Sequence, residues 1–194
     1  MGWPNAYVNV TITDSAGGSA TWATEAVTNG VGVNNGILQV VGTNSDDKIT
    51  VKQTDPDVYQ VKIRQKGNST SETYSISDPV SRVDVYGRDG GDMITLANSV
   101  TVASALNGGN DDDLIYGGQG NDTIDGGAGN DKLFGRSGND IIYGRDGHDR
   151  LWGKHGDDLL DGGDGEDKIS GGAGKDTIYG GADDDVIWGS DTMT

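Results

Sequence analysis

The 194-residue chain has no cysteine, one phenylalanine and three prolines, and only 32% of its residues are hydrophobic. Without cysteine, neither a disulfide framework nor a thiolate metal site can form. We find no apolar run of membrane-spanning length and no signal-peptide pattern, so no membrane span is predicted. Capped segments with helical spacing are also missing, and we expect no strong helix. The lack of cysteine leaves the compartment open, because a secreted chain can be stabilised by metal instead.

Basic residues are scarce as well: 14 lysines and arginines face 31 acidic residues, which gives a net charge of -17. Low hydrophobicity combined with high net charge ordinarily favours disorder. The chain can fold only if something neutralises its carboxylates. The same acidity argues against nucleic acid as a partner, because such binding depends on neutralising phosphates with basic side chains.

Glycine and aspartate are abundant, and from residue 108 to residue 188 they are locked to a period of nine. The blocks read GGNDDDLIY, GGQGNDTID, GGAGNDKLF, GRSGNDIIY, GRDGHDRLW, GKHGDDLLD, GGDGEDKIS, GGAGKDTIY and GGADDDVIW. Position one is always Gly and position eight is always Ile or Leu. Position six is always aspartate: Asp113, Asp122, Asp131, Asp140, Asp149, Asp158, Asp167, Asp176 and Asp185. Composition bias would scatter these residues, so the pattern indicates a repeat architecture.

Glycine-rich turns that alternate with three-residue strands predict a parallel β-solenoid. Side chains alternate along a strand, so position eight points inward. One inward residue per nine cannot enclose a core, but two facing rows can, and one turn of the solenoid should therefore take two repeats. Alternate repeats then stack into two columns, one starting at Asp113 and the other at Asp122. Rungs are about 4.8 Å apart, where neighbouring carboxylates repel by about 1 kcal/mol in water.

A hard divalent cation between rungs would turn this repulsion into attraction. Calcium accepts carboxylate and carbonyl oxygens in flexible geometry, whereas magnesium demands stricter geometry and keeps its water. Zinc would need His or Cys, and neither recurs at a repeat position. Aspartates can also cap turns without metal, but nine in register favour a metal site. The columns of five and four aspartates leave four and three gaps, so up to about seven calcium ions would fit.

GGQGNDTID and GGAGNDKLF resemble the haemolysin-type calcium-binding nonapeptide, GGxGxDxUx, of the repeats-in-toxin (RTX) family. The resemblance is close over residues 108–188 and looser over residues 42–50 and 87–95. It implies an all-β, right-handed parallel β-roll, calcium between adjacent turns, and export by a type I secretion route.

The resemblance also implies a set of calcium ligands. Side-chain ligands would be the nine position-six aspartates and Asp92, and carbonyl ligands would come from the turn glycines Gly117, Gly118, Gly120, Gly126, Gly127, Gly129, Gly162, Gly163 and Gly165. Five residues depart from the glycine pattern, at position two Arg136, Arg145 and Lys154 and at position four Asp111 and Asp183. Their carbonyls can serve only if these side chains tolerate the turn geometry.

The N-terminal part is β-rich and irregular. Two strands are predicted within residues 5–27, where YVNVTITDSAGGSATW is weakly similar to the last hairpin of immunoglobulin-like or PKD-like domains. A linker or loop is expected over residues 28–36, a strand over 37–41, a hairpin of 58–64 with 72–76, and a strand around Val83 and Val85. Residues 96–107 are one repeat plus three and shift the frame. We therefore divide the chain into a hairpin and linker (1–36), which the similarity makes a remnant of an Ig-like domain, a cap with degenerate repeats (37–107) and the calcium roll (108–194).

The function predicted from the sequence is a secreted, non-enzymatic calcium-binding β-roll module whose folding is coupled to Ca2+. We expect it outside the cell or on its surface, as a monomer or part of a longer chain. The chain stops directly after the last repeat, which favours a fragment of a larger protein. Catalytic residues are not predicted: the only histidines, His148 and His155, stand at different repeat positions and are expected in solvent-facing turns.

The alternative is a carbohydrate-binding or accessory module of an extracellular enzyme such as a lipase, protease or polysaccharide epimerase, with polysaccharide as partner. Position nine carries aromatics that could stack on sugars, among them Tyr116, Phe134, Trp152 and Trp188. Position seven of the same column carries Lys132, Arg150 and Lys168, which could bind an acidic polysaccharide. Packing between strands explains the aromatic row more simply, and charge balance explains the basic row.

Overall fold

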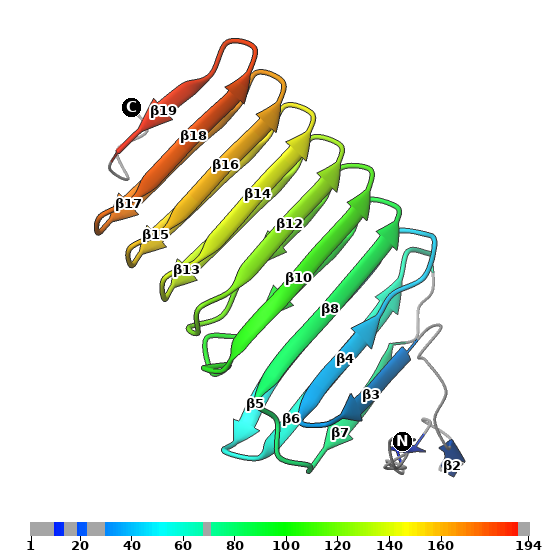
Figure 1. The fold of residues 1–194 in the computed structure, drawn as a ribbon. Coiled ribbons are helices and arrows are strands. Elements are labelled where there is room, and N and C mark those ends of the chain that lie inside the picture. The colour runs from blue at the N-terminus through cyan, green and yellow to red at the C-terminus, as the bar shows by residue number, and fades with distance from the viewer. Residues whose placement is uncertain (1–9, 14–18, 23–29, 68–70, 190–194) are drawn as a thin grey trace, which may run out of the picture.

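The computed structural model describes residues 10–13, 19–22, 30–67 and 71–189, and within them every regular element is a strand. Two sheets of mainly parallel strands face each other and form a β-solenoid (Figure 1), so the predicted fold class is confirmed. In the part of the chain described, no helix is long and apolar enough to cross a membrane.

One sheet has eight strands and the other nine. The eight-stranded sheet runs, from its C-terminal edge, through β18 (Thr177–Ala182), β16 (Leu159–Asp164), β14 (Ile141–Asp146), β12 (Thr123–Ala128), β10 (Ala103–Asn110), β8 (Arg82–Asp89), β4 (Ile37–Val41) and β3 (Gly30–Asn34). The nine-stranded sheet runs through β19 (Val186–Trp188), β17 (Lys168–Ala173), β15 (Arg150–His155), β13 (Lys132–Ser137), β11 (Leu114–Tyr116), β9 (Met93–Leu96), β5 (Asp47–Asp55), β6 (Val58–Gln65) and β7 (Glu72–Ile76). A separate pair, β1 (Val10–Thr13) and β2 (Ser19–Trp22), is antiparallel.

The register confirms that one coil of the solenoid takes two repeats. Lys132 of β13 pairs with Arg150 of β15, 18 residues later, and the same offset recurs in both sheets. Ile94 pairs instead with Ile115, 21 residues later, because the insertion at residues 96–107 adds three residues to one coil. Successive repeats therefore alternate between the two sheets, as the column argument predicts.

The core is a double row of branched aliphatic side chains between the sheets. Nine of the inward residues at position eight are at most 1% exposed: Leu106, Ile124, Ile142 and Leu160 from one sheet, and Ile94, Ile115, Leu133, Leu151 and Ile169 from the other. In the last coil, Ile178 is partly buried and Ile187 is 47% exposed. The N-terminal end has a wider core, because β6 and β7 add buried Tyr59, Val61, Tyr74 and Ile76. Each later coil contributes one inward aliphatic residue from each of its two strands.

The predicted linker at residues 28–36 is wrong, because residues 30–34 form β3, the edge of the eight-stranded sheet. Val31 and Val33 alternate inward, and β3 pairs antiparallel with β4. The connection is Asn35-Gly36, with φ angles of 50° and 76°. Positive φ at both central residues defines a type I′ hairpin turn, for which Asn-Gly is the preferred sequence. The signal was present in the sequence as Asn-Gly between two apolar runs.

The other N-terminal expectations divide into confirmed and untested ones. The strand at 37–41, the hairpin of 58–64 with 72–76 and the strand around Val83 are confirmed. β1 and β2 confirm the two strands predicted within residues 5–27, whereas the turn between them and the C-terminal residues 190–194 lie outside the described residues. The division at residue 107 stays a prediction; β10 crosses that position and both sheets are continuous there.

Candidate metal centre

The position-six aspartates form two buried columns, one beside each sheet. Seven of the nine predicted residues are at most 3% exposed: Asp113, Asp122, Asp131, Asp140, Asp149, Asp158 and Asp167. Asp176 and Asp185, in the last coil, are half-buried. The column of the nine-stranded sheet also includes Asp92 and Asp47, which are equally buried. Carboxylates are almost never buried without a compensating partner, so each column requires an explanation.

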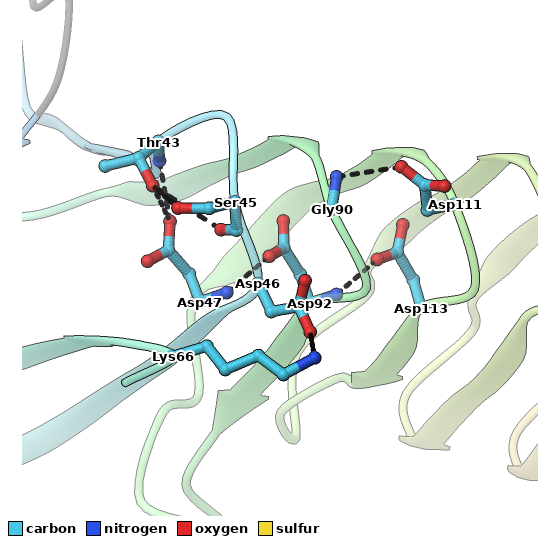
Figure 2. Close-up of polar contacts among 9 residues, drawn as sticks. All are labelled: Thr43, Ser45, Asp46, Asp47, Lys66, Gly90, Asp92, Asp111 and Asp113. Atoms are coloured by element: carbon cyan, nitrogen blue, oxygen red, sulfur yellow. Dashed lines mark hydrogen bonds and ion pairs between the residues drawn. The ribbon is translucent and has the colours of Figure 1, made fainter. Parts of the chain in front are cut away.

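One carboxylate oxygen of each aspartate is used by the backbone. Oδ1 of Asp131 accepts a hydrogen bond of 2.7 Å from the N–H of Asp113, one coil earlier. The pattern repeats through both columns and continues from Asp113 to Asp92 and from Asp92 to Asp47 (Figure 2). The N-terminal extension to Asp47 was not in the predicted ligand set. The sequence feature that indicates this extension is the degenerate repeat at residues 42–50, which has Gly, Asp and Ile at positions one, six and eight.

The second oxygen of most of these aspartates has no hydrogen-bond partner. Buried Oδ2 atoms without one belong to Asp92, Asp113, Asp131, Asp140, Asp149, Asp158, Asp167 and Asp176. A buried, unpaired carboxylate oxygen costs several kcal/mol unless a cation or a donor satisfies it. The oxygens without a partner recur at position six of successive repeats, which points to a repeated ligand rather than to isolated defects.

The position-one glycine of each repeat leaves the space into which this oxygen points. A methyl group on Cα of Gly126 would lie 2.2 Å from Oδ2 of Asp131 and 2.9 Å from the carbonyl oxygen of Gly144, one coil later. At Gly144 the corresponding distances, to Asp149 and Gly162, are both 2.3 Å. Each of these places, here called a cradle, brings together a carboxylate oxygen of one coil and a carbonyl oxygen of the next.

Positions two and four of the turn have positive φ angles, and this conformation survives where glycine is replaced. Gly127 and Gly129 have φ of 107° and 137°. At position two, Arg136, Arg145 and Lys154 have φ of 79°, 89° and 81°; at position four, Asp111 and Asp183 have 78° and 74°. Positive φ is uncommon outside glycine and costs about 1–2 kcal/mol. The five departures from the repeat pattern therefore keep the turn geometry at an energetic cost.

The repeat that begins at Gly117 differs, although its sequence matches the pattern in full. Gly118 and Gly120 are not among the residues with positive φ. The N–H of Gly118 donates to Oδ2 of Asp122 at 2.7 Å, so this oxygen is already satisfied. Asp122 is the first aspartate of its column, and Ser104 occupies the preceding rung and donates to its Oδ1. At Asp47, first in the other column, Thr43 N–H satisfies Oδ2 in the same way (Figure 2).

Burial raises the pKa of the column aspartates above the ordinary value of 3.8. Desolvation is the main cause, opposed by the backbone N–H donors, and it raises the pKa of Asp92 and Asp149 to about 7 and that of Asp113 and Asp140 to about 8. Asp131 reaches about 6. Burial also raises the pKa of Asp122, Asp158 and Asp167. At neutral pH the metal-free columns are therefore strained by partly ionised, poorly solvated carboxylates.

The donor set fits calcium. No three His, Cys, Asp or Glu side chains gather into one metal-sized cluster among the described residues, so any ion here must draw much of its coordination from backbone carbonyls. Calcium accepts mixed carboxylate and carbonyl ligands in flexible geometry, whereas zinc favours His and Cys. An anionic oxygen without a partner, beside a carbonyl oxygen of the next coil, is a suitable start for such a shell.

His148 lies in an exposed turn, as predicted, whereas His155 is exposed but is the last residue of strand β15. His148 belongs to a second ladder, at position five, in which a side-chain atom accepts the backbone N–H one coil later. Its Nδ1 accepts from Glu166 at 2.9 Å, and Asn130 Oδ1 accepts from His148 itself. Asn139 and Asp157 make the same contact in the other column. His148 thus joins neighbouring coils through its side chain.

A methyl group inside a cradle should destabilise the calcium-loaded roll. We expect Gly126→Ala to lower the thermal midpoint in calcium by roughly 4–8 °C, because its Cβ would collide with Asp131 and Gly144, an overpacking cost of about 2 kcal/mol. The control is Gly189→Ala, which meets no atom within 4 Å. Thermal melts followed by circular dichroism compare the two. Equal midpoints for both variants would contradict a tight cradle.

A scan against protein-family profiles matches four copies of the RTX calcium-binding nonapeptide repeat, at residues 105–133, 125–160, 134–169 and 161–191. The matched stretch covers the regular coils from residue 105 onward, which include the cradles at Gly126 and Gly144, and it confirms the resemblance seen in the sequence. Searches of curated proteins and of solved structures each found no match. The RTX repeat is a structural, calcium-binding repeat, so this region is a calcium-binding β-roll.

Proposed function

Because residues 105–191 are RTX calcium-binding nonapeptide repeats, we propose that the protein is a secreted, non-enzymatic module whose roll folds on binding calcium between coils. The main support is the row of eight buried Oδ2 atoms without a partner, seven of which lie beside a glycine carbonyl of the next coil. Calcium there would satisfy those oxygens and offset the repulsion within each column. Metal binding and folding are then one equilibrium, because neighbouring coils together form the site.

We assign calcium to the cradles that meet two conditions. A methyl group added to Cα of the position-one glycine would lie within 3 Å of an Oδ2 atom that has no partner, and within 3 Å of a carbonyl oxygen of the next coil. Five such cradles lie in the column of the nine-stranded sheet, at Gly87, Gly108, Gly126, Gly144 and Gly162, and two in the other, at Gly135 and Gly153. The carboxylate ligands are then Asp92, Asp113, Asp131, Asp149 and Asp167 in the first column, and Asp140 and Asp158 in the second.

This assignment also agrees with seven ions, but at a partly different set of gaps. The gap between Asp92 and Asp113 is included. The gap after Asp122 is excluded, because Gly118 already satisfies its Oδ2. Carbonyl ligands are assigned to position-one glycines such as Gly126 and to positions two and four, where Gly127, Gly129, Gly163 and Gly165 share positive φ. Asp176 and Asp185 are secondary candidates, since no carbonyl of a following coil is near them in the described chain.

Folding coupled to calcium would make the chain responsive to its compartment. Extracellular calcium modules bind with dissociation constants of about 10⁻⁴–10⁻³ M, which leaves them empty where calcium is scarce and filled outside the cell. A chain with a net charge of -17 stays extended while its carboxylates repel one another. We therefore place the folded module outside the cell or on its surface, after export as an unfolded chain.

Removing one carboxylate from a cradle should remove bound calcium. For Asp149→Asn we expect the number of ions bound at saturation to fall by at least one, measured by equilibrium dialysis at pH 7. The matched control is Asp112→Asn, an exposed turn aspartate whose Oδ1 accepts the N–H of Asn130. The control makes the same change of charge and keeps an acceptor oxygen. An unchanged ion number in Asp149→Asn, or equal losses in both variants, would contradict the assignment.

A further inference from the structure

Positive charge is distributed very unevenly over this acidic molecule. Of the 14 lysines and arginines, nine alternate with buried residues on strands of the nine-stranded sheet and so lie on its outer face: Lys48, Lys52, Lys62, Arg64, Lys132, Arg136, Arg150, Lys154 and Lys168. From β9 to β19, the outward positions of this sheet carry no acidic residue. The acidic residues of the roll lie in the turns and on the other sheet.

The basic residues form a straight row over three adjacent strands. Lys132, Arg150 and Lys168 are exposed and pair in register across β13, β15 and β17. Neighbouring strands are about 4.8 Å apart, so these cations repel one another. If these cations served only to balance charge, carboxylates placed between them would neutralise them more effectively. A row that keeps its mutual repulsion, on a chain with 31 acidic residues, indicates an anionic partner.

The outer face of the eight-stranded sheet shows the contrasting arrangement. There Arg82 pairs with Asp84 and Arg145 pairs with Asp125, so cations and carboxylates neutralise each other within the sheet. A further ion pair, between Lys66 and Asp46, also lies away from the row. Lys132, Arg150 and Lys168 belong to none of these three pairs.

An aromatic strip runs beside the basic row. Tyr116, Phe134 and Trp152 stack on consecutive rungs, with ring centroids 4.7 Å and 4.3 Å apart. The guanidinium of Arg136 lies 4.9 Å from the Tyr116 ring centroid and donates to the carbonyl of Leu96. Because the rings cover each other's faces, the strip presents mainly ring edges outward. It makes a rigid, apolar floor and offers few free faces to a planar ligand.

We propose that the outer face of the nine-stranded sheet over β13, β15 and β17 binds a linear anionic polysaccharide. Cations repeat at the strand spacing, which is comparable to the length of one sugar residue, so successive acidic groups of an extended chain can each meet a cation. The apolar strip lies where the C–H groups of the sugar rings would rest. This binding goes beyond calcium-dependent folding and requires only that the roll is folded.

Single-stranded nucleic acid fits the same face less well. Its bases bind by stacking on exposed aromatic faces, and here the rings are stacked on each other. Its dense phosphate charge would also meet strong repulsion from the rest of a chain with a net charge of -17. A polysaccharide with about one acidic group per sugar residue carries its charge at wider intervals. Direct competition between the two ligands therefore belongs to the test.

The test uses the full chain in calcium and oligogalacturonate of defined length as probe, with binding followed by calorimetry at low salt. We expect wild type to bind, with affinity that falls as salt rises. The triple variant Lys132→Gln, Arg150→Gln, Lys168→Gln should bind at least tenfold more weakly. The matched control, Lys66→Gln, Arg145→Gln, Lys175→Gln, changes the net charge equally at sites off the row and should bind like wild type. Unchanged circular dichroism and bound calcium establish that both variants are folded.

Further probes distinguish the kinds of anionic polymer that this face could bind. Binding of both oligogalacturonate and dextran sulfate, but not of neutral dextran, supports an anionic polysaccharide, and the tighter of the two identifies carboxylate or sulfate as its acidic group. No binding of either anionic probe by wild type would overturn the proposal. Equal losses in the two triple variants, or tighter binding of an oligothymidylate than of either polysaccharide, would overturn it as well. Loss of calcium binding alone would instead count against the proposed calcium sites.

Discussion

Removing calcium should unfold the roll from residue 105 onward and leave strands in the N-terminal part of the chain. In the roll, most coils bury one aliphatic residue per sheet together with carboxylates whose Oδ2 atoms lack a partner. The N-terminal end buries Tyr59, Val61, Tyr74 and Ile76 besides its inward rows. The roll therefore depends on the ion for its stability far more than the N-terminal end does.

Hydrogen–deuterium exchange with peptide resolution measures this difference directly. In calcium, the strand amides within residues 30–67 and 71–189 should be protected. In excess chelator, peptides from residues 114–189 should exchange at rates close to those of an unfolded chain, while peptides covering β4, β5 and β6 stay protected. Restoring calcium should restore protection, and an equal concentration of magnesium should not, because magnesium demands stricter geometry. Protection of the roll that is equal with and without calcium would contradict coupled folding, and loss of all protection would contradict the independent N-terminal core.

The regular part of this fold could be predicted because each repeat carries the same local information. Glycine at position one, aspartate at six and an aliphatic residue at eight fix the turn, the column and the inward face together. From those positions alone follow the 18-residue coil and the pairing of Lys132 with Arg150. A strict period makes local and non-local contacts equivalent, since every coil meets a copy of itself.

Residues at the start of a column could not be predicted in this way, because their environment depends on a different neighbour. The block that begins at Gly117 has an ideal sequence, yet its turn lacks the positive φ angles of the others and Gly118 satisfies Asp122. The preceding rung offers Ser104 in place of an aspartate, a consequence of the insertion at residues 96–107. The sequence pattern is enough to identify a repeat. Whether Oδ2 of its aspartate has a hydrogen-bond partner depends on the residues of the preceding coil as well.

The basic residues on the outer face of the nine-stranded sheet show a second limit to prediction from the sequence. Lys132, Arg150 and Lys168 form a row in the sequence, but from the sequence alone charge balance is the preferred explanation. The structure adds the lysines and arginines of β5 and β6 to the same face. It also places the acidic residues Asp84 and Asp125 on the opposite sheet, each with an arginine partner. Segregation of charge between two faces is a property of the folded chain, and the spacing within one repeat does not contain it.

Acid should replace part of the effect of calcium, so that the metal-free chain gains β-structure as the pH falls from 8 to about 4. Burial raises the pKa of Asp92 and Asp149 to about 7 and that of Asp113 and Asp140 to about 8, against 3.8 in the unfolded chain. Between those values the folded state binds more protons than the unfolded state. By linkage, these groups favour the fold fully below pH 3.8, and their contribution is lost as the pH rises through about 7–8. The metal-free fold is therefore stabilised by acid, whereas ordinary acid denaturation destabilises a fold at low pH.

Circular dichroism of desalted, metal-free protein titrated from pH 8 to pH 4 measures the effect, and a parallel titration in saturating calcium should be flat from pH 8 to pH 6. Strand content that rises with pH, or does not change, would contradict the raised pKa values.

A double variant, Asp131→Asn with Asp149→Asn, distinguishes protonation of the buried aspartates from a general loss of charge repulsion at low pH. The introduced amides can donate toward the carbonyls of Gly144 and Gly162, which the cradle geometry places nearby. At pH 7 this variant should therefore contain more strand than wild type without calcium and bind fewer ions with it, whereas the control Asp112→Asn should change neither.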